Sequence, residues 1–210
     1  MSRGRWYLPG MLYDMAFEWM FRGLRRAVLL KVEKGRLYPW LDVCCGTGSQ
    51  FRPLAGRRPE YGPVVGLDRS LGMVHYAAAR SPGRSYVCGD ASRLPFKPGA
   101  FRAVSVSFGL HDKSPAARRA MMDEAKRVLG EGGRLIAVDF ESPWSLKSRF
   151  AALFTWIVER LAGGDHYRNG REFLRRGGLR PFLRENGFAE VTRRDVEAGC
   201  LGIVVSRPLP

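Results

Sequence analysis

Short apolar runs alternate with longer stretches of helical periodicity over most of the chain. Each run has the length of a strand and is bounded by turn-forming residues, whereas the stretches between them space apolar residues three or four positions apart. Strands that alternate with helices form a mostly parallel sheet with helices on both faces. The pattern therefore predicts a doubly wound α/β fold. The expected strands cover residues 38–44, 63–68, 84–88, 102–107 and 133–139.

The second half of the chain carries signals for where helices begin and end. Ser114 precedes Pro115, a pair typical of a helix N-terminus, and the helical pattern runs to Leu129 before it meets Gly130. Further on, residues 174–186 predict another helix. The chain then closes with two apolar runs that predict an antiparallel hairpin, at residues 188–192 and 201–205.

A glycine turn follows the first expected strand directly. Because Gly46 and Gly48 carry no Cβ, a ligand can approach the backbone closely there. A glycine turn between a strand and a helix is the nucleotide-binding corner of doubly wound, Rossmann-like sheets. The third glycine of the dinucleotide fingerprint G-x-G-x-x-G is absent, because Phe51 stands in its place. The turn therefore predicts a nucleotide site without predicting NAD.

Two aspartates indicate which nucleotide binds. Asp42 lies four positions before Gly46, where a carboxylate suits a cationic ammonium and sulfonium better than a pyrophosphate. Asp68 ends the second expected strand, where a carboxylate accepts hydrogen bonds from both hydroxyls of a ribose. Together they favour S-adenosylmethionine as the cofactor. A structural turn with two surface aspartates is the less favoured interpretation.

The motifs that carry a family resemblance lie in five segments: Asp42–Gly48, Gly66–Met73, Gly89–Phe96, Ser105–Leu110 and Arg127–Leu135. Together they resemble class I methyltransferase motifs. In this combination they resemble the UbiE-like family, the quinone C-methyltransferases of ubiquinone and menaquinone synthesis. The resemblance covers roughly residues 38–142. It implies methyl transfer from S-adenosylmethionine to a small hydrophobic acceptor, such as a ring carbon of a quinone precursor.

The glycine turn and the two aspartates are expected to hold the methionine and ribose parts of the cofactor. Backbone atoms of Gly46 and Gly48 are expected to approach these parts, together with the Thr47 hydroxyl. Asp42 is expected at the charged methionine end, and Asp68 on the ribose diol.

The adenine and the remaining contacts are assigned to later segments and to the N-terminus. Met73 offers a soft apolar surface to the adenine, although plain helix packing would also explain it. Asp90 is expected to accept from the adenine amino group while the Ala91 amide donates to a ring nitrogen. The family resemblance adds Ser107, at the end of the fourth strand, and Tyr13, in a Tyr-Asp pair near the methionine end.

The sequence departs from the family pattern after the fourth expected strand. Quinone enzymes of the family usually carry Phe-Gly-Leu-Arg-Asn there, whereas this chain has His111 and Asp112 after Phe-Gly-Leu. C-methylation requires the acceptor phenol to lose a proton, and a histidine that titrates near neutrality can accept it. We expect His111 to be this catalytic base, oriented by Asp112 or Asp139. The alternative is a histidine that only lines the pocket and positions the substrate.

The flanks of the motif region are expected to enclose the cofactor and the acceptor. Residues 1–37 predict a helical cap over the cofactor. Residues 143–173 predict an inserted helical segment that walls the acceptor side, although an ordinary core helix fits equally well. Near its end, Tyr167 and Arg168 are expected in a loop, and the whole chain, 1–210, in a single domain. The segment's aromatic residues include Trp144, Phe150, Phe154 and Trp156.

Composition limits the partners without deciding among them. The net charge of +15 favours anionic partners, but the arginines are spread along the chain rather than clustered. No apolar run reaches the roughly 18 residues of a membrane span, and the N-terminus lacks a signal-peptide pattern. We therefore expect a cytoplasmic protein, with peripheral contact at the inner face of a membrane as an open alternative. The four cysteines lack metal-ligand spacing, so we expect small buried residues and no metal.

Three other functions stay open at this point. A phospholipid or amine N-methyltransferase would also use a basic surface and an aromatic lid. The charge is compatible with an RNA methyltransferase, but the Asn/Asp-Pro-Pro-aromatic motif with which base-amino methylases stack a flipped base is missing after the fourth strand. A cofactor-binding protein without catalysis is disfavoured because the cofactor motifs are complete.

Overall fold

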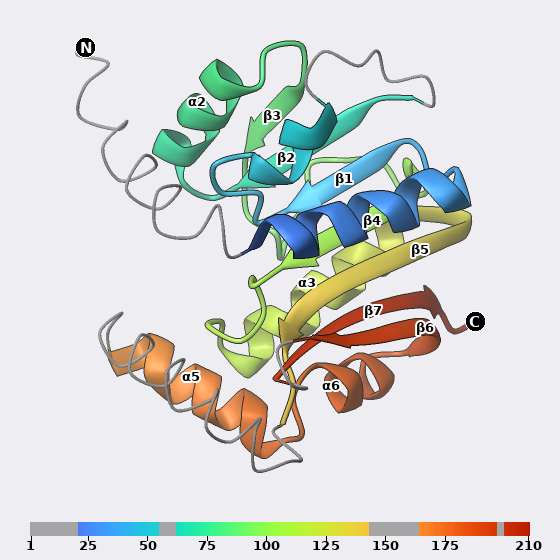
Figure 1. Ribbon diagram of the computed structural model, residues 1–210. Helices are drawn as coiled ribbons and strands as arrows, with labels where there is room; N and C mark the ends of the chain where they lie inside the picture. Colours follow the sequence, from blue (N-terminus) through green and yellow to red (C-terminus); the bar gives the residue numbers. More distant parts are fainter. Residues whose placement is uncertain (1–20, 55–61, 143–163, 197–199) are drawn as a thin grey trace.

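The computed structural model describes residues 21–54, 62–142, 164–196 and 200–210. They form a seven-stranded sheet of order β3-β2-β1-β4-β5-β7-β6, with helices on both faces (Figure 1). The expected strands and the closing hairpin are all confirmed. The strands are β1 (Trp40–Val43), β2 (Val64–Asp68), β3 (Ser85–Cys88), β4 (Phe101–Ser107), β5 (Leu129–Phe140), β6 (Phe188–Val196) and β7 (Leu201–Pro208).

The pairing of the strands confirms the doubly wound topology. Strands β1 to β5 run parallel, with β1 paired to both β2 and β4. Strand β7 lies antiparallel between β5 and β6. After β3 the chain crosses back to place β4 beside β1, so the strand order reverses between β1 and β4. Ligands of such sheets bind at this switch point, outside the carboxyl ends of the strands.

Both faces of the central strands are buried, and alternate residues of these strands supply the two layers of core, whereas the edge strands β3 and β6 are partly exposed. On one face, Leu41 and Leu135 pack with residues of α3 and α6. On the other, Trp40 and Ile136 pack with the helix over residues 21–35 and with η1. The central strands are therefore mostly apolar on both sides, as the continuous runs predict. The helices are the one over residues 21–35, η1 (Ser49–Leu54), α2 (Leu71–Arg80), α3 (Pro115–Val128), α5 (Gly164–Arg175) and α6 (Leu179–Glu185).

The structure confirms the expected start of one helix and corrects the expected extent of another. Helix α3 begins as predicted, because the Ser114 side chain accepts a hydrogen bond from the Ala117 amide at 3.3 Å. The single helix expected over residues 174–186 is wrong, since α5 ends and α6 begins inside that span. Gly177 and Gly178, with φ of 99° and 77°, interrupt the helix in the left-handed region.

The loop expected around Tyr167 is also wrong, because this residue lies in α5. Helix α5 is held by Arg118 of α3, whose buried guanidinium donates to Glu172 Oε2 at 2.7 Å and to the Asn169 carbonyl oxygen at 2.9 Å. The same guanidinium lies 5.0 Å from the ring centroid of Phe173. These tertiary contacts outweigh the weak helix propensity of the segment.

Several expected features lie outside the described residues or differ from expectation. Tyr13 and the aromatic part of the segment 143–173 lie outside them. The thiols are free but not uniformly buried: Cys45 and Cys200 are buried, whereas Cys88 is exposed, which corrects the expectation for that residue. Over the described ranges, no helix is long and apolar enough to cross a bilayer. Within the same ranges, no group of three or more His, Cys, Asp or Glu residues could hold a metal ion.

Candidate active site

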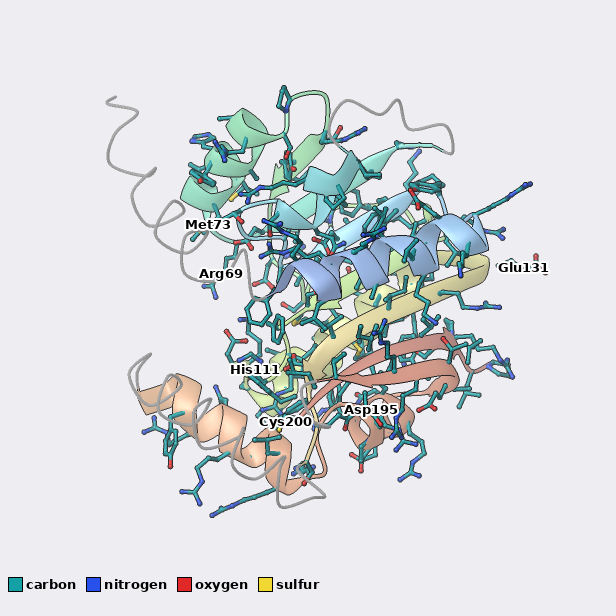
Figure 2. All side chains as sticks on the ribbon, viewed as in Figure 1. Arg69, Met73, His111, Glu131, Asp195 and Cys200 are labelled. Atoms are coloured by element: carbon teal, nitrogen blue, oxygen red, sulfur yellow. The ribbon has the colours of Figure 1, made fainter. Side chains whose placement is uncertain are left out.

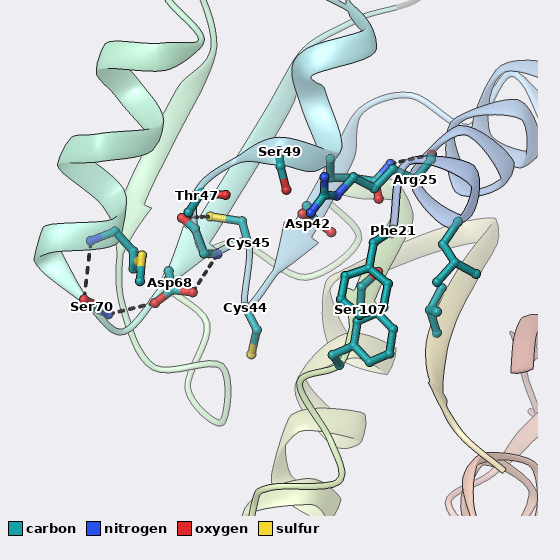
Figure 3. Close-up of a pocket in the computed structure, with 16 residues that line it drawn as sticks. Phe21, Arg25, Asp42, Cys44, Cys45, Thr47, Ser49, Asp68, Ser70 and Ser107 are labelled. Carbon is teal, nitrogen blue, oxygen red and sulfur yellow. Dashed lines mark hydrogen bonds between the residues drawn. The ribbon is translucent and has the colours of Figure 1, made fainter. Parts of the chain in front are cut away.

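The turn after β1 is shaped by backbone in the left-handed region and fixed by Asp68. The φ angles of Cys44, Gly46 and Gly48 are 59°, 51° and 68°. Asp68 Oδ2 accepts a hydrogen bond from the Gly46 amide at 2.8 Å, and Oδ1 accepts one from the Ser70 amide at 2.9 Å (Figure 3). A carboxylate has about four acceptor sites, so Asp68 retains capacity for ligand hydroxyls. It therefore ties the glycine turn to the start of α2 while facing the ligand space.

The two glycines of the turn have different surroundings. A Cβ added to Gly46 would meet no atom within 4 Å, so this position opens into space. A Cβ on Gly48 would lie 2.5 Å from Tyr86 Oη and 2.8 Å from Ala77 Cβ. Gly46 thus leaves room for a ligand, whereas Gly48 leaves room for α2 and β3. The predicted contact of Gly48 with the cofactor stays a prediction.

A cavity of about 350 Å³ lies at the carboxyl ends of β1, β2 and β4, at the switch point of the sheet. Its size is in the usual range of small-molecule sites. Figure 2 shows Met73 and His111 on this edge of the sheet and Glu131 on the opposite edge. Of the residues predicted to bind the cofactor, those that line the cavity are Asp42, Gly46, Thr47, Asp68, Met73 and Ser107.

Two of the predicted adenine contacts, Asp90 and Ala91, lie outside the lining of this cavity, whereas Met73 is part of it. Asp90 is exposed, and its Oδ1 accepts hydrogen bonds from Ser92 N at 2.8 Å and Ser92 Oγ at 2.7 Å. These hydrogen bonds lower the pKa of Asp90, because they stabilise the charged form. Ala91 follows it in the same turn. Asp90 is therefore a preformed anionic acceptor outside the cavity lining.

The helix over residues 21–35 contributes lining residues that the sequence analysis did not name. Phe21, Leu24 and Arg25 line the cavity, and their spacing of three and four positions places them on one face of the helix. This spacing could have identified them from the sequence, since residues 1–37 were expected to form a helical cap over the cofactor. Phe108, which follows Ser107, is a further lining residue from the loop after β4.

Asp42 is a buried carboxylate with a polar network behind it. Ser105 Oγ donates to Asp42 Oδ1 at 2.5 Å, and Trp40 Nε1 donates to Ser105 Oγ at 2.7 Å. Burial raises the pKa of Asp42 to about 7, against the opposing effects of the Ser105 hydrogen bond and the positive charge of Arg25. A cationic ligand group would favour the ionised carboxylate. Asp42 is therefore suited to a ligand that brings a positive charge.

His111 and Asp139 form a buried pair, and neither residue is part of the cavity lining. Asp139 is fully buried, and its Oδ1 lies 2.8 Å from His111 Nδ1. Asp112, the other partner considered, instead pairs with Lys113 Nζ at 2.5 Å. His111 lies in the loop after β4 and Asp139 near the end of β5, so the pair ties that loop to the neighbouring parallel strand.

A row of aromatic rings connects the cavity to His111. The ring centroids of Phe21 and Phe108, both in the cavity lining, are 4.6 Å apart. Phe108 is 5.9 Å from Phe140, and Phe140 is 4.7 Å from His111 with the rings nearly perpendicular. The row provides apolar ring faces between the cavity and the imidazole, as a planar aromatic ligand would require.

Comparison with known proteins places this site in a family. A model of the methyltransferase domain matches residues 41–133. A demethylmenaquinone methyltransferase of Beutenbergia cavernae is 41% identical over 120 residues, 57% of this chain and 47% of that protein. The ubiquinone/menaquinone biosynthesis C-methyltransferase UbiE of Methylobacterium nodulans is 33% identical over 214 residues, 91% of this chain and 84% of that protein. The chain belongs to the UbiE-like methyltransferase family.

The UbiE-like chain spans about half the length of the Beutenbergia relative, with 47% of that protein covered. Among solved structures, the PH0226 protein of Pyrococcus horikoshii superposes with a TM-score of 0.67 at 21% identity, over 91% of both chains. This likeness shows the shared fold. Membership of the family confirms the resemblance carried by the five motif segments, and with it S-adenosylmethionine as the cofactor.

Proposed function

We propose that this UbiE-like protein transfers the methyl group of S-adenosylmethionine to a ring carbon of a phenolic quinone precursor, with His111 as the general base. The observation that carries the proposal is the His111–Asp139 pair at the end of the aromatic row. A phenol must be deprotonated before its ring carbon becomes nucleophilic, and this pair is built to accept a proton. The name of the Beutenbergia relative, a demethylmenaquinone methyltransferase, agrees with an acceptor of this class.

The residues at the cavity fit the cofactor. Gly46 leaves space beside the backbone, Asp68 keeps acceptor capacity for the ribose hydroxyls, and Asp42 is buried where a cationic group would ionise it. Met73 lines the cavity at the start of α2 and would cover the adenine. When bound, S-adenosylmethionine supplies an electrophilic methyl group on a cationic sulfur.

Further cofactor contacts are part of the same proposal. Thr47 and Ser107 line the cavity and would contact the methionine and ribose portions. Asp90 and the Ala91 amide would pair with the adenine edge beyond the lining, and Gly48 would keep the turn close to α2. The remaining contact, Tyr13, is proposed from the family pattern alone.

His111 can accept the phenol proton because Asp139 sets its tautomer. With Nδ1–H donated to the Asp139 carboxylate, the lone pair lies on Nε2, which takes the proton from the phenol oxygen. The electron pair released to the ring would then form the new carbon–carbon bond to the methyl group, and the carbon–sulfur bonding pair would stay on the sulfur of the cofactor. The ring proton would pass to water, which restores the aromatic phenolate, and the His111 imidazolium would return its proton to the phenolate oxygen. Asp139 stabilises the imidazolium that forms at the first step.

The acceptor class also bears on where the protein works. A quinone precursor with a long apolar tail resides in a membrane, so we propose peripheral contact of a cytoplasmic protein with the inner face of that membrane. The net charge of +15 suits anionic headgroups. Cosedimentation with anionic and with zwitterionic vesicles tests this contact, and equal binding to both would contradict a charge-based one.

The base is tested with labelled cofactor and a short-chain demethylmenaquinol. We expect His111→Gln to lower kcat by about 10²–10⁴-fold at unchanged cofactor affinity, the usual contribution of one general base. His75, exposed on α2, is the matched control, and His75→Gln should retain full turnover. Full turnover in His111→Gln would reduce His111 to a lining residue. Methylation of an amine or of phosphatidylethanolamine, with the quinol unreactive, would favour the N-methyltransferase alternative.

A further inference from the structure

Arg25 brings a positive charge into the cofactor cavity from the helix over residues 21–35. It lines the cavity beside Phe21 and Leu24, and its Nη1 atom is buried. The neighbouring arginines of the same helix, Arg22 and Arg26, are exposed. Arg25 is therefore turned toward the sheet, where an arginine is rarely placed without an anionic partner or a ligand to bind.

The guanidinium of Arg25 lies next to the carboxylate of Asp42. Asp42 and Trp40 point to the face of β1 that this helix covers, and Figure 3 shows the Arg25 side chain reaching over Asp42. The two charges interact, since Arg25 acts on the ionisation of Asp42. Gln50 of η1 donates to the Arg25 carbonyl oxygen at 2.9 Å, which fixes this turn of the helix against the end of the glycine turn. One end of the cavity therefore presents a cation and an anion side by side.

We propose that Arg25 binds the carboxylate of the cofactor's amino-acid end while Asp42 binds its ammonium. The inference rests on the proposed function, because it takes S-adenosylmethionine as the ligand. The amino-acid end carries a carboxylate and an ammonium on one carbon, so it needs an adjacent cation and anion. Adenine and ribose carry no anionic group, so within the cofactor the carboxylate is the group that a guanidinium can pair with. Guanidinium and carboxylate also match in a two-hydrogen-bond geometry.

Two ligands separate this contact from the rest of the site. S-adenosylhomocysteine carries the amino-acid end and lacks the reactive methyl group, whereas 5′-methylthioadenosine lacks the amino-acid end altogether. Calorimetry with both ligands is performed on the full chain and on Arg25→Met, Arg25→Lys and Arg26→Met. We expect Arg25→Met to lower the affinity for S-adenosylhomocysteine by about 10–100-fold and to change the affinity for 5′-methylthioadenosine by no more than about twofold. Arg25→Lys should fall between the wild type and Arg25→Met, since lysine keeps the charge and loses the planar fork.

Arg26→Met is the matched control, because it removes the same charge one residue away at an exposed position. It should bind both ligands as the wild type does. Unchanged S-adenosylhomocysteine affinity in Arg25→Met overturns the inference, as does an equal loss for both ligands, which would make Arg25 a purely structural residue. If Arg25→Met does not fold, the test uses Arg25→Lys instead. This variant should lose affinity for S-adenosylhomocysteine but not for 5′-methylthioadenosine, and an equal loss for both ligands would again overturn the inference. These measurements use no acceptor, so the inference can fail while methyl transfer to the quinol stands. A wild type that binds neither ligand would overturn the proposed function itself.

Discussion

Asp139 holds His111 both by its ring and by its backbone. The Oδ1 atom lies 2.8 Å from His111 Nδ1, and Oδ2 accepts from the backbone amides of Leu110 at 3.0 Å and His111 at 3.3 Å. Oδ1 also accepts from the Phe140 amide at 2.8 Å. One buried carboxylate therefore fixes the position of the loop after β4 and the orientation of the imidazole within this loop.

Replacement of this carboxylate by an amide should impair catalysis more than folding. In Asp139→Asn the side chain keeps its size, but it loses the charge that stabilises an imidazolium and no longer dictates the tautomer. We expect kcat to fall by about 10²–10⁴-fold with S-adenosylhomocysteine affinity unchanged. Residual activity should show its rising pH limb displaced to lower pH, because the imidazole becomes less basic. A purely structural role would lower the melting temperature and leave the position of that limb unmoved.

The sequence was sufficient to predict those features that depend on residues close to one another along the chain. The glycine turn, Asp42 and Asp68 are at strand ends that the apolar pattern already locates, and Ser114 caps α3 through a contact three residues away. The partner of His111 was narrowed only to Asp112 or Asp139. The choice depends on β5 lying next to β4, which is a property of the sheet order and not of any local pattern.

The wrong expectation for α5 has its origin in contacts between distant segments. Helix α5 stands where a loop was expected, because Arg118 from α3 binds its backbone and Glu172. The surroundings of Gly48, where Tyr86 from β3 and Ala77 from α2 lie close, were likewise not predicted. Neither set of contacts is visible in local propensity, since both bring together residues that the fold alone makes neighbours.

The two glycines of the turn should respond differently to alanine. Both have positive φ, so either substitution strains the backbone by about 1–2 kcal/mol. At Gly48 the added methyl group also collides with Tyr86 and Ala77, which should add about 1–3 kcal/mol of destabilisation. At Gly46 it enters open space in the cavity, so Gly46→Ala should weaken S-adenosylhomocysteine binding more than stability. Urea unfolding and calorimetry on both variants measure the two effects, and identical profiles for the pair would contradict the division of roles.

Removal of Arg118 should release α5 from α3. Arg118→Met deletes the hydrogen bonds to Glu172 and to the Asn169 carbonyl oxygen, and it leaves Glu172 without this partner in a half-buried position. We expect the free energy of unfolding to fall by about 2–4 kcal/mol, measured by urea denaturation. Arg119→Met, on the exposed side of the same helix turn, should change it by less than about 0.5 kcal/mol. Similar losses in the two variants would show that Arg118 acts through general charge and not through this network.

Asp42 should make the unliganded protein less stable as pH rises. Its pKa is raised from 3.8 to about 7, so between these values the folded protein holds a proton that the unfolded chain releases. The free energy of unfolding therefore decreases with increasing pH across roughly pH 4–7, by an amount on the order of a few kcal/mol. Asp42→Asn cannot ionise and should reduce the slope of this dependence, but not to zero, because burial also raises the pKa of Glu141 to about 7. Thermal unfolding at a series of pH values measures the slope. A variant that follows the wild-type curve would assign the pH dependence to another group.

Cofactor affinity should change with pH in the opposite direction. The ammonium of S-adenosylhomocysteine needs an ionised carboxylate, and Asp42 is mostly protonated below pH 7 in the empty cavity. Binding must then release a proton, so affinity should rise by up to about tenfold per pH unit below pH 7 and level off above it. Calorimetry in buffers of different ionisation enthalpy measures the released proton directly. The ligand 5′-methylthioadenosine, which lacks the ammonium, should show no such rise, and Asp42→Asn should bind S-adenosylhomocysteine weakly at every pH. A rise shared by both ligands would place the titrating group at the ribose or adenine, away from Asp42.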